Sequence, residues 1–134
     1  MLNSWKEPDA ANEMVTYNVE PDPGSEWGGG AWPRGRLTGV DIRLLPAGTE
    51  VIVDTRNSRY RLVMVDGVVR DALVEGGRHF AQQTTARIEG SSLSGSLLKI
   101  GWIGLGLRLE LSHGYRRIVT STVRTITVDG STCR

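Results

Sequence analysis

The sequence predicts an all-β fold, a small antiparallel barrel of six or seven strands, with a two-sheet sandwich as the alternative. Three observations predict it. The 134 residues include 17 glycines and few runs of strong helix formers. Apolar and polar residues alternate in short segments separated by turn residues, which is typical of half-buried strands. The most apolar stretch, residues 97–111, changes its apolar side midway, as a strand does at a barrel corner.

This apolar stretch determines how the rest of the chain must pack. Before Gly101 the apolar residues occupy even positions, and from Ile103 onward they occupy odd positions. Glycines at the change of phase permit a bulge or a sharp coil. The uncharged part, residues 100–107, is far shorter than the roughly 20 residues of a membrane-spanning helix. The sequence therefore predicts a buried, kinked strand and no membrane segment.

The barrel region begins with strand-like segments joined by short turns. Residues 40–45 form a first short strand that ends at Pro46, and residues 50–55 form a second. Residues 56–59 have the composition of a turn, and residues 60–65 follow as a strand of alternating pattern. These strands predict the start of a meander.

The second half of the meander has a strong turn signal. Asp66 and Gly67 predict a type I′ turn into a strand at residues 68–74. Residues 79–89 form the next strand, poorer in apolar residues, and residues 90–96 form a loop before the glycine-rich stretch. The last strand-like segments are residues 115–120 and 121–128.

Residues 1–36 differ from the barrel region, residues 37–134. They hold four of the five prolines and show no sustained strand or helix period, so we expect an irregular arm. Trp5, Trp27 and Trp32 lie in it, although a purely solvating segment has little use for such rings. The arm either covers its own domain or binds a partner through these tryptophans.

Charge is unevenly distributed along the chain. The total is +1, which implies no strong field for nucleic acid or for an acidic substrate. Residues 1–36 carry six acidic and three basic residues, a net charge of −3, and the remainder carries +4. Small barrels can bind single-stranded nucleic acid through arginines that share a face. The candidates for such a face are Arg56, Arg59, Arg61, Arg70, Arg116, Arg117 and Arg124.

No catalytic constellation follows from the sequence. Nothing pairs His79 or His113 with a nucleophile, and Cys133 is the only cysteine, so we expect no catalytic residues, metal or cofactor. The beginning of the chain has no apolar core of signal-peptide length, so we expect a cytoplasmic protein. The candidate ligand-binding residues are His79, Gln82, Gln83 and Glu89.

These observations favour a non-enzymatic barrel for assembly or protein-partner binding. Arg59 and Arg61, together with the tryptophans of the arm, are the candidate partner-binding residues. The arm would cover exposed strand edges of another copy, which predicts a homo-oligomer, most simply a dimer. The alternatives are a barrel that binds single-stranded nucleic acid or a small ligand and, less favoured, a small hydrolase.

Overall fold

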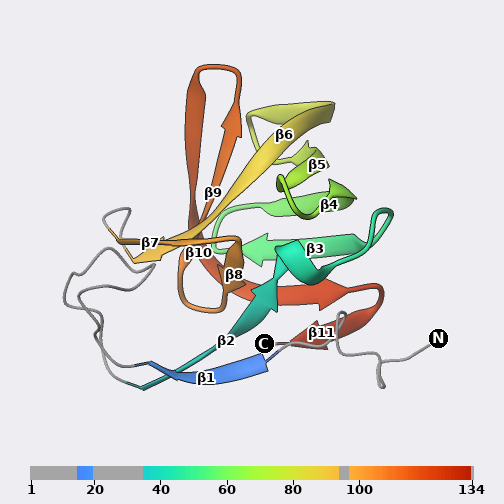
Figure 1. Ribbon diagram of the computed structural model, residues 1–134. Coiled ribbons are helices and arrows are strands. Elements are labelled where there is room, and N and C mark those ends of the chain that lie inside the picture. The colour runs from blue at the N-terminus through green and yellow to red at the C-terminus, as the bar shows by residue number, and fades with distance from the viewer. Residues whose placement is uncertain (1–14, 20–34, 94–96, 134) are drawn as a thin grey trace.

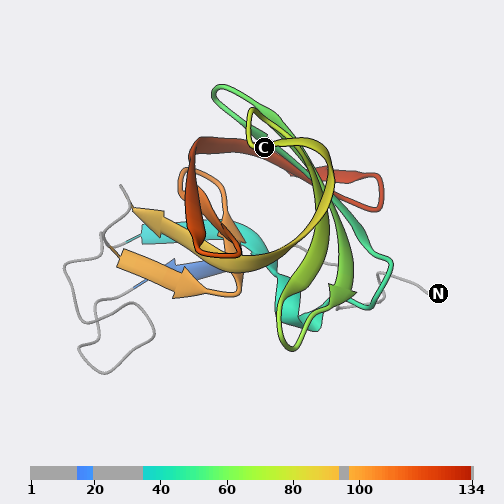
Figure 2. The same ribbon diagram turned by 90° about the horizontal axis from the view of Figure 1, so that it is seen from above.

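The computed structural model describes residues 15–19, 35–93 and 97–133, and six of its strands close into a barrel (Figures 1 and 2). Each strand pairs antiparallel with the next, and the last pairs with the first. The six strands are β3 (Glu50–Thr55), β4 (Arg59–Asp66), β5 (Asp71–Gly76), β6 (Phe80–Leu93), β9 (Arg108–His113) and β10 (Arg116–Val128). The all-β prediction is confirmed, with a ring of hydrogen-bonded strands.

Five further strands lie outside this ring. β1 (Val15–Val19), β2 (Gly35–Asp41) and β8 (Trp102–Gly104) form a three-stranded antiparallel sheet. β7 (Leu97–Ile100) pairs with β6, and β11 (Ser131–Cys133) pairs with β10. β1 and the first two residues of β2 fall within residues 1–36, so this region contains regular structure. Trp5, Trp27 and Trp32 lie outside the described residues.

The core lies inside the ring, and it follows from the alternation in the sequence. Val51 and Val53 of β3 are buried, as are Leu62 and Met64 of β4. Alternate residues of a strand point to opposite faces, so these positions all face the barrel interior. The long strand β6 adds Phe80, Ala86 and Ile88, and β9 adds Leu109 and Leu111.

Residues 40–45 do not form the expected strand. β2 ends at Asp41, and Ile42–Leu44 form the 3-10 helix η2. The Asp41 carboxylate accepts a hydrogen bond from the Arg43 backbone N–H at 3.0 Å, so it caps the helix and turns the chain. Ile42 is fully buried, and its N–H donates to the Gly101 carbonyl. The segment thus closes one end of the barrel.

The type I′ turn predicted at Asp66 and Gly67 is wrong. Residues 67–70 connect β4 to β5, and the left-handed residue is Arg70, at φ 64°. Gly67 serves a different purpose, because a Cβ there would lie 2.8 Å from the Ile42 carbonyl oxygen. Glycine is therefore needed where the turn packs against η2. The expected strand at residues 68–74 accordingly begins only at Asp71.

The expectation of a loop at residues 90–96 is wrong for residues 90–93, which continue β6, and residues 94–96 lie outside the described part. The chain turns at Gly101, which has φ 74°, but residues 97–111 form three strands, β7, β8 and β9, so the prediction of one kinked strand is wrong. The predicted change of the buried side is also wrong, because the buried residue of β7 is Lys99, an odd position like Ile103 and Leu109, and Ile100 is 40% exposed. The Lys99 amino group lies 5.9 Å from the centre of the Trp102 ring, a cation-π contact that stabilises a buried ammonium.

Candidate functional site

A hollow opens beside β10 because its two halves pair on different edges. Residues 116–119 and Thr122 pair with β9, with a register shift between Val119 and Thr122, whereas residues 123–128 pair with β3. β3 ends at Thr55, so the first half of β10 faces turns where a neighbouring strand would otherwise lie. The resulting cavity has a volume of about 600 Å³. Its lining is Asn57, Ser58, Tyr60, Arg78, His79, Ile118, Val119, Thr120 and Ser121.

A second cavity of about 490 Å³ continues this hollow. It shares Asn57, Val119, Thr120 and Ser121 with the first, so the two form one depression across the bulge of β10. The residues that only the second cavity adds are Arg56, Arg108 and Thr122. We call the combined depression the cationic groove. Each part has the size of a typical ligand site.

Hydrogen bonds fix the floor of the cationic groove. The Asn57 backbone N–H donates to Ser121 Oγ at 2.9 Å, and Ser121 Oγ donates to Thr55 Oγ1 at 2.9 Å. The Arg56 N–H donates to the Thr122 carbonyl at 2.8 Å. These bonds tie the turn between β3 and β4 to the bulge, so the groove has a preformed shape.

Arginines without acidic partners surround this groove. Arg56, Arg78 and Arg108 are exposed and form no ion pair with a described residue, and none of the described residues that line the groove is acidic. Five other arginines of the described part are compensated by carboxylates, whereas Arg87, Arg116 and Arg124 are not. The ion pairs are Arg43–Asp41, Arg59–Asp54, Arg61–Glu50, Arg70–Glu89 and Arg117–Glu110. Unpaired guanidinium groups around one groove suit an anionic ligand.

His79 and Tyr60 complete the end of the groove. Arg116 Nη2 lies 2.8 Å from His79 Nδ1, and because an arginine can only donate, the His79 nitrogen accepts this hydrogen bond. Burial raises the pKa of the Tyr60 phenol, and its hydrogen bond with Ser58 lowers it by less. Tyr60 is therefore neutral and adds no negative charge to the groove.

The four candidate ligand-binding residues do not share one pocket. His79 lines the cationic groove, whereas Gln82 and Gln83 are exposed on β6 and do not line it. Glu89 lies ten residues after His79, and it accepts hydrogen bonds from Ser112 Oγ at 2.5 Å and Arg70 Nη2 at 3.3 Å. Of the four, His79 alone belongs to the groove.

The candidate partner-binding arginines of β4 are held by neighbouring carboxylates. Arg59 Nε lies 2.7 Å from Asp54 Oδ1, and Arg61 Nε lies 2.6 Å from Glu50 Oε2. The hydrogen bond from Arg59 lowers the pKa of Asp54, and burial partly opposes this shift. These arginines point away from the barrel and form a charge-compensated surface with β3.

Sequence reasoning missed Arg78, Arg108 and Glu110 as site residues. Arg78 and Arg108 are 30 residues apart and meet at one groove through β10, which no local pattern reveals. Glu110 occupies a polar position of the alternation in residues 103–111, yet it is completely buried. The fourteen arginines were a signal of anion binding, but their number did not indicate which lack acidic partners.

The described residues contain no group of three or more histidine, cysteine, aspartate or glutamate side chains able to hold a metal ion. His113 Nδ1 lies 3.0 Å from the Thr85 carbonyl oxygen, which engages its ring. In this part of the chain there is also no helix of the length and hydrophobicity that a bilayer crossing requires.

Comparison with known proteins gives no relative: no protein-family model, curated protein or solved structure matches the chain. The groove is therefore interpreted from its own chemistry.

Proposed function

We propose that the protein is a non-enzymatic assembly module whose cationic groove binds a carboxylate-rich polypeptide segment of a second copy. The observation that carries this proposal is the set of three unpaired arginines around the groove, Arg56, Arg78 and Arg108. Guanidinium groups bind carboxylates in planar, bidentate geometry. A groove without carboxylates of its own leaves those donors free for a ligand.

Residues 1–36 supply the matching charge. They carry six acidic and three basic residues, against a net charge of +4 in the rest of the chain. An acidic segment of one copy and a basic groove of another attract each other, and the exchange can be reciprocal in a two-fold dimer. Trp5, Trp27 and Trp32 would add apolar contacts to such an interface.

Binding is favoured over catalysis by the partners that the polar groups already have. His79 accepts a hydrogen bond from Arg116, and no carboxylate in the described lining orients it as a base. The groove supplies positive charge, hydroxyl groups and one amide. This set recognises an anion and activates no nucleophile.

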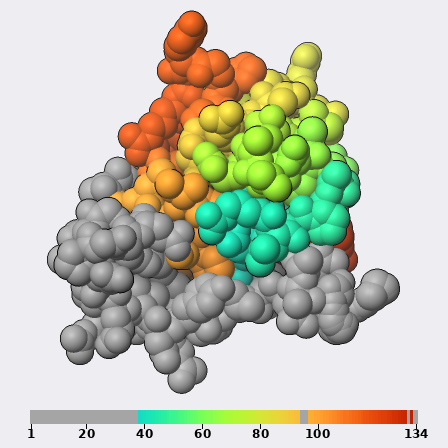
Figure 3. Space-filling view, in the orientation of Figure 1, coloured from blue at the N-terminus to red at the C-terminus, as the bar shows by residue number. Residues whose placement is uncertain are grey.

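Binding of single-stranded nucleic acid is the second candidate, and one exposed aromatic residue favours it. Tyr115 is fully exposed at the tip of the hairpin of β9 and β10, next to Arg116. This hairpin projects beyond the rest of the barrel (Figure 3). Single-strand binders, however, stack several bases on aromatic rings, and the aromatic residue among the described groove lining is the buried Tyr60.

Sedimentation equilibrium of the full chain tests the assembly. We expect a dimer that weakens at high salt, because salt screens exposed charge pairs. Arg56→Ala/Arg108→Ala should raise the dimer dissociation constant about 10- to 100-fold, as expected for two charge-assisted contacts. Arg87→Ala/Arg124→Ala is the matched control, since it removes the same charge from exposed residues outside the groove. A monomeric full chain, or equal weakening by the control, would contradict the proposal.

A labelled single-stranded oligonucleotide tests the second candidate. We expect no binding tighter than about 10 µM near physiological salt, which is weaker than typical specific nucleic-acid complexes. Submicromolar, salt-sensitive binding that is lost on Tyr115→Ala would replace protein assembly with nucleic-acid binding.

A further inference from the structure

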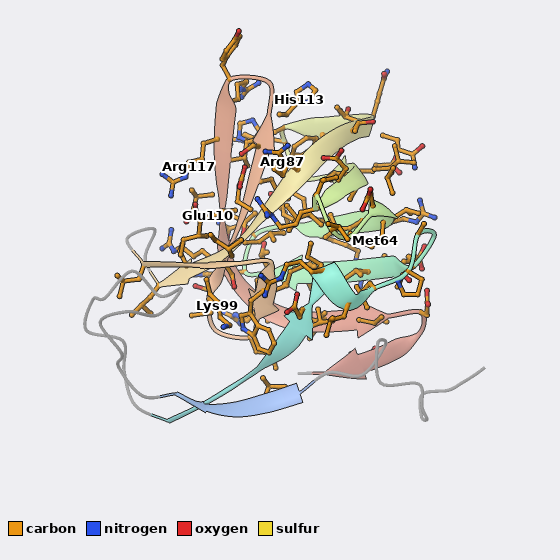
Figure 4. The ribbon with its side chains drawn as sticks, in the orientation of Figure 1. Met64, Arg87, Lys99, Glu110, His113 and Arg117 are labelled. Carbon is orange, nitrogen blue, oxygen red and sulfur yellow. The ribbon has the colours of Figure 1, made fainter. Side chains whose placement is uncertain are left out.

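A buried carboxylate next to the groove holds an exposed arginine in place. Glu110 of β9 is 0% exposed, and Oε1 accepts two hydrogen bonds from Arg117 of β10, one from Nε at 2.8 Å and one from Nη2. The side chain of Arg117 is 58% exposed. Figure 4 shows the two residues side by side on neighbouring strands, with Arg117 directed away from the barrel.

Arg117 and Glu110 lie on the two strands that border the cationic groove, although neither residue is part of its lining. Glu110 pairs directly with Val119, and Val119 lines both parts of the groove. Arg117 lies two residues from Val119 on β10, so both point to the same outer face. Arg108, which also lines the groove, lies two residues from Glu110 on β9. Arg117 and Arg108 therefore flank Val119 and Glu110.

Stability alone does not explain Glu110. Its second oxygen, Oε2, is buried and has no hydrogen-bond partner, and Ser92 Oγ, also buried, lacks one as well. Ser92 lies two residues from Gly90, the residue that pairs with Glu110, so it belongs to the same face of the neighbouring strand. A buried, half-satisfied carboxylate is less stable than a well-packed apolar side chain of similar volume. The buried pair is therefore weak evidence for a role in stability.

The contribution of Glu110 is the orientation of Arg117. A free arginine on a surface samples many rotamers and loses this freedom when it binds. Here Nε and Nη2 are held by Glu110, which fixes the plane of the guanidinium group. An arginine has five N–H donors, so the remaining ones stay available to an anion.

We propose that Arg117 is a further anion contact of the cationic groove and that Glu110 is its positioning residue. This inference rests on the proposed function, since the ligand is the same acidic segment. The segment lies in the groove, crosses Val119 and reaches the oriented guanidinium group of Arg117 with another carboxylate.

Three variants test the inference by sedimentation equilibrium and thermal unfolding. Glu110→Gln removes the buried charge, so we expect an equal or higher melting temperature together with a dimer dissociation constant raised about 3- to 10-fold. Arg117→Lys keeps the charge but loses the planar fork, and we expect a similar weakening. Glu110→Gln/Arg117→Ala leaves no buried charge unpaired. Its dimer dissociation constant should exceed that of Arg117→Lys by no more than about 3-fold.

Glu89→Gln is the control, because Glu89 is a half-buried acid paired with Arg70 away from the groove. It should lower the melting temperature without changing the dissociation constant. The inference is overturned if Glu110→Gln lowers the melting temperature and leaves dimer affinity unchanged, as a purely structural residue would. It is also overturned if Arg56→Ala/Arg108→Ala weakens the dimer and Arg117→Lys does not. If Arg56→Ala/Arg108→Ala itself has no effect, the proposed function has failed instead.

Discussion

Two surfaces of this barrel carry arginines and are separated by one turn of the chain. They differ in whether their arginines form ion pairs. On the outer face of β3 and β4, Arg59 and Arg61 are bound by Asp54 and Glu50. In the cationic groove, Arg56, Arg78 and Arg108 form no ion pair with any residue that the structure describes. Because Arg56 and Arg59 are only three residues apart, the difference does not arise from local composition. It arises from which strand lies opposite.

The pairing of the strands explains this difference. Asp54 lies directly opposite Arg59 in the antiparallel register of β3 and β4, so carboxylate and guanidinium groups meet on one face. Arg56 and Arg78 lie in turns, where no partner strand supplies an acidic residue. The comparison teaches that an arginine opposite a carboxylate in the sheet register has its charge compensated, whereas an arginine in these turns keeps its donors for a ligand.

The largest loss of stability is expected on substitution of Gly76, the glycine that joins the two surfaces. Gly76 has φ 129° and pairs with Tyr60, and a Cβ there would lie 2.0 Å from the Arg59 carbonyl oxygen. Gly76→Ala should therefore lower the free energy of unfolding by about 2 to 4 kcal/mol, through strain and steric overlap. Denaturant unfolding monitored by tryptophan fluorescence measures this change.

Gly114→Ala separates the two causes. Gly114 has φ 62°, but a Cβ there would meet nothing within 4 Å, so only backbone strain of about 1 kcal/mol is expected. If Gly76→Ala and Gly114→Ala lower the free energy of unfolding equally, the close approach of β4 and β5 does not contribute to stability. Gly76 then does not join the two surfaces.

One arginine from each surface gives the next largest effect. Arg78→Ala should raise the dimer dissociation constant about 3- to 10-fold and change the free energy of unfolding by less than about 0.5 kcal/mol. Arg61→Ala should do the opposite: it leaves dimerisation unchanged and costs at most about 1 kcal/mol of stability, as exposed ion pairs do. Sedimentation and denaturant unfolding measure the two quantities. If both variants weaken the dimer equally, the distinction between the two surfaces is wrong.

The smallest effect is a pH dependence confined to the paired surface. The hydrogen bond from Arg59 lowers the pKa of Asp54 below its ordinary value of 3.8, so the folded state binds this proton less readily than the unfolded state. The stabilising contribution is present above about pH 4 and disappears as the pH falls through the lower, folded-state pKa. The melting temperature of Asp54→Asn should lie about 2 to 4 °C below that of the unchanged protein at pH 7 and approach it near pH 2.

Arg108→Ala is the counterpart from the groove. Arg108 has no carboxylate partner, so any difference in its melting temperature should stay constant between pH 2 and pH 7. A constant difference for Asp54→Asn would show that its ion pair does not contribute to stability.

Local patterns predicted much of the fold. The alternation in residues 60–65 places Tyr60, Leu62 and Met64 on one face, and the structure confirms this, since all three are buried. The glycine signal at Gly101 marked a turn of the chain, although the predicted single kinked strand is three strands, β7, β8 and β9. The errors occur where tertiary contacts override a local preference. Gly67 is required by packing against η2, and Lys99 is buried against Trp102.

The site was far less predictable. His79 was the single candidate ligand-binding residue that the structure places in the groove. The groove forms between strands that meet only when the barrel closes. Whether Arg78 and Arg108 remain unpaired depends on how the register of the other strands distributes the carboxylates among the arginines. The burial of Glu110 on an outer face likewise follows from tertiary packing. The local pattern, in which Glu110 alternates with leucines, predicts exposure instead.

The closing seam between β3 and β10 has a consequence for folding kinetics. Adjacent hairpins join residues close in sequence, but the hydrogen bond between Thr125 and Asp54 spans 71 residues, and the one between Ser121 and Thr55 spans 66. Long-range pairing carries the larger loop-closure entropy, so we expect the hairpins to form first and the seam last. The cationic groove spans this seam, with Arg56 on one side and the β10 bulge on the other. A ligand bound across the seam would stabilise the closed barrel and slow its opening.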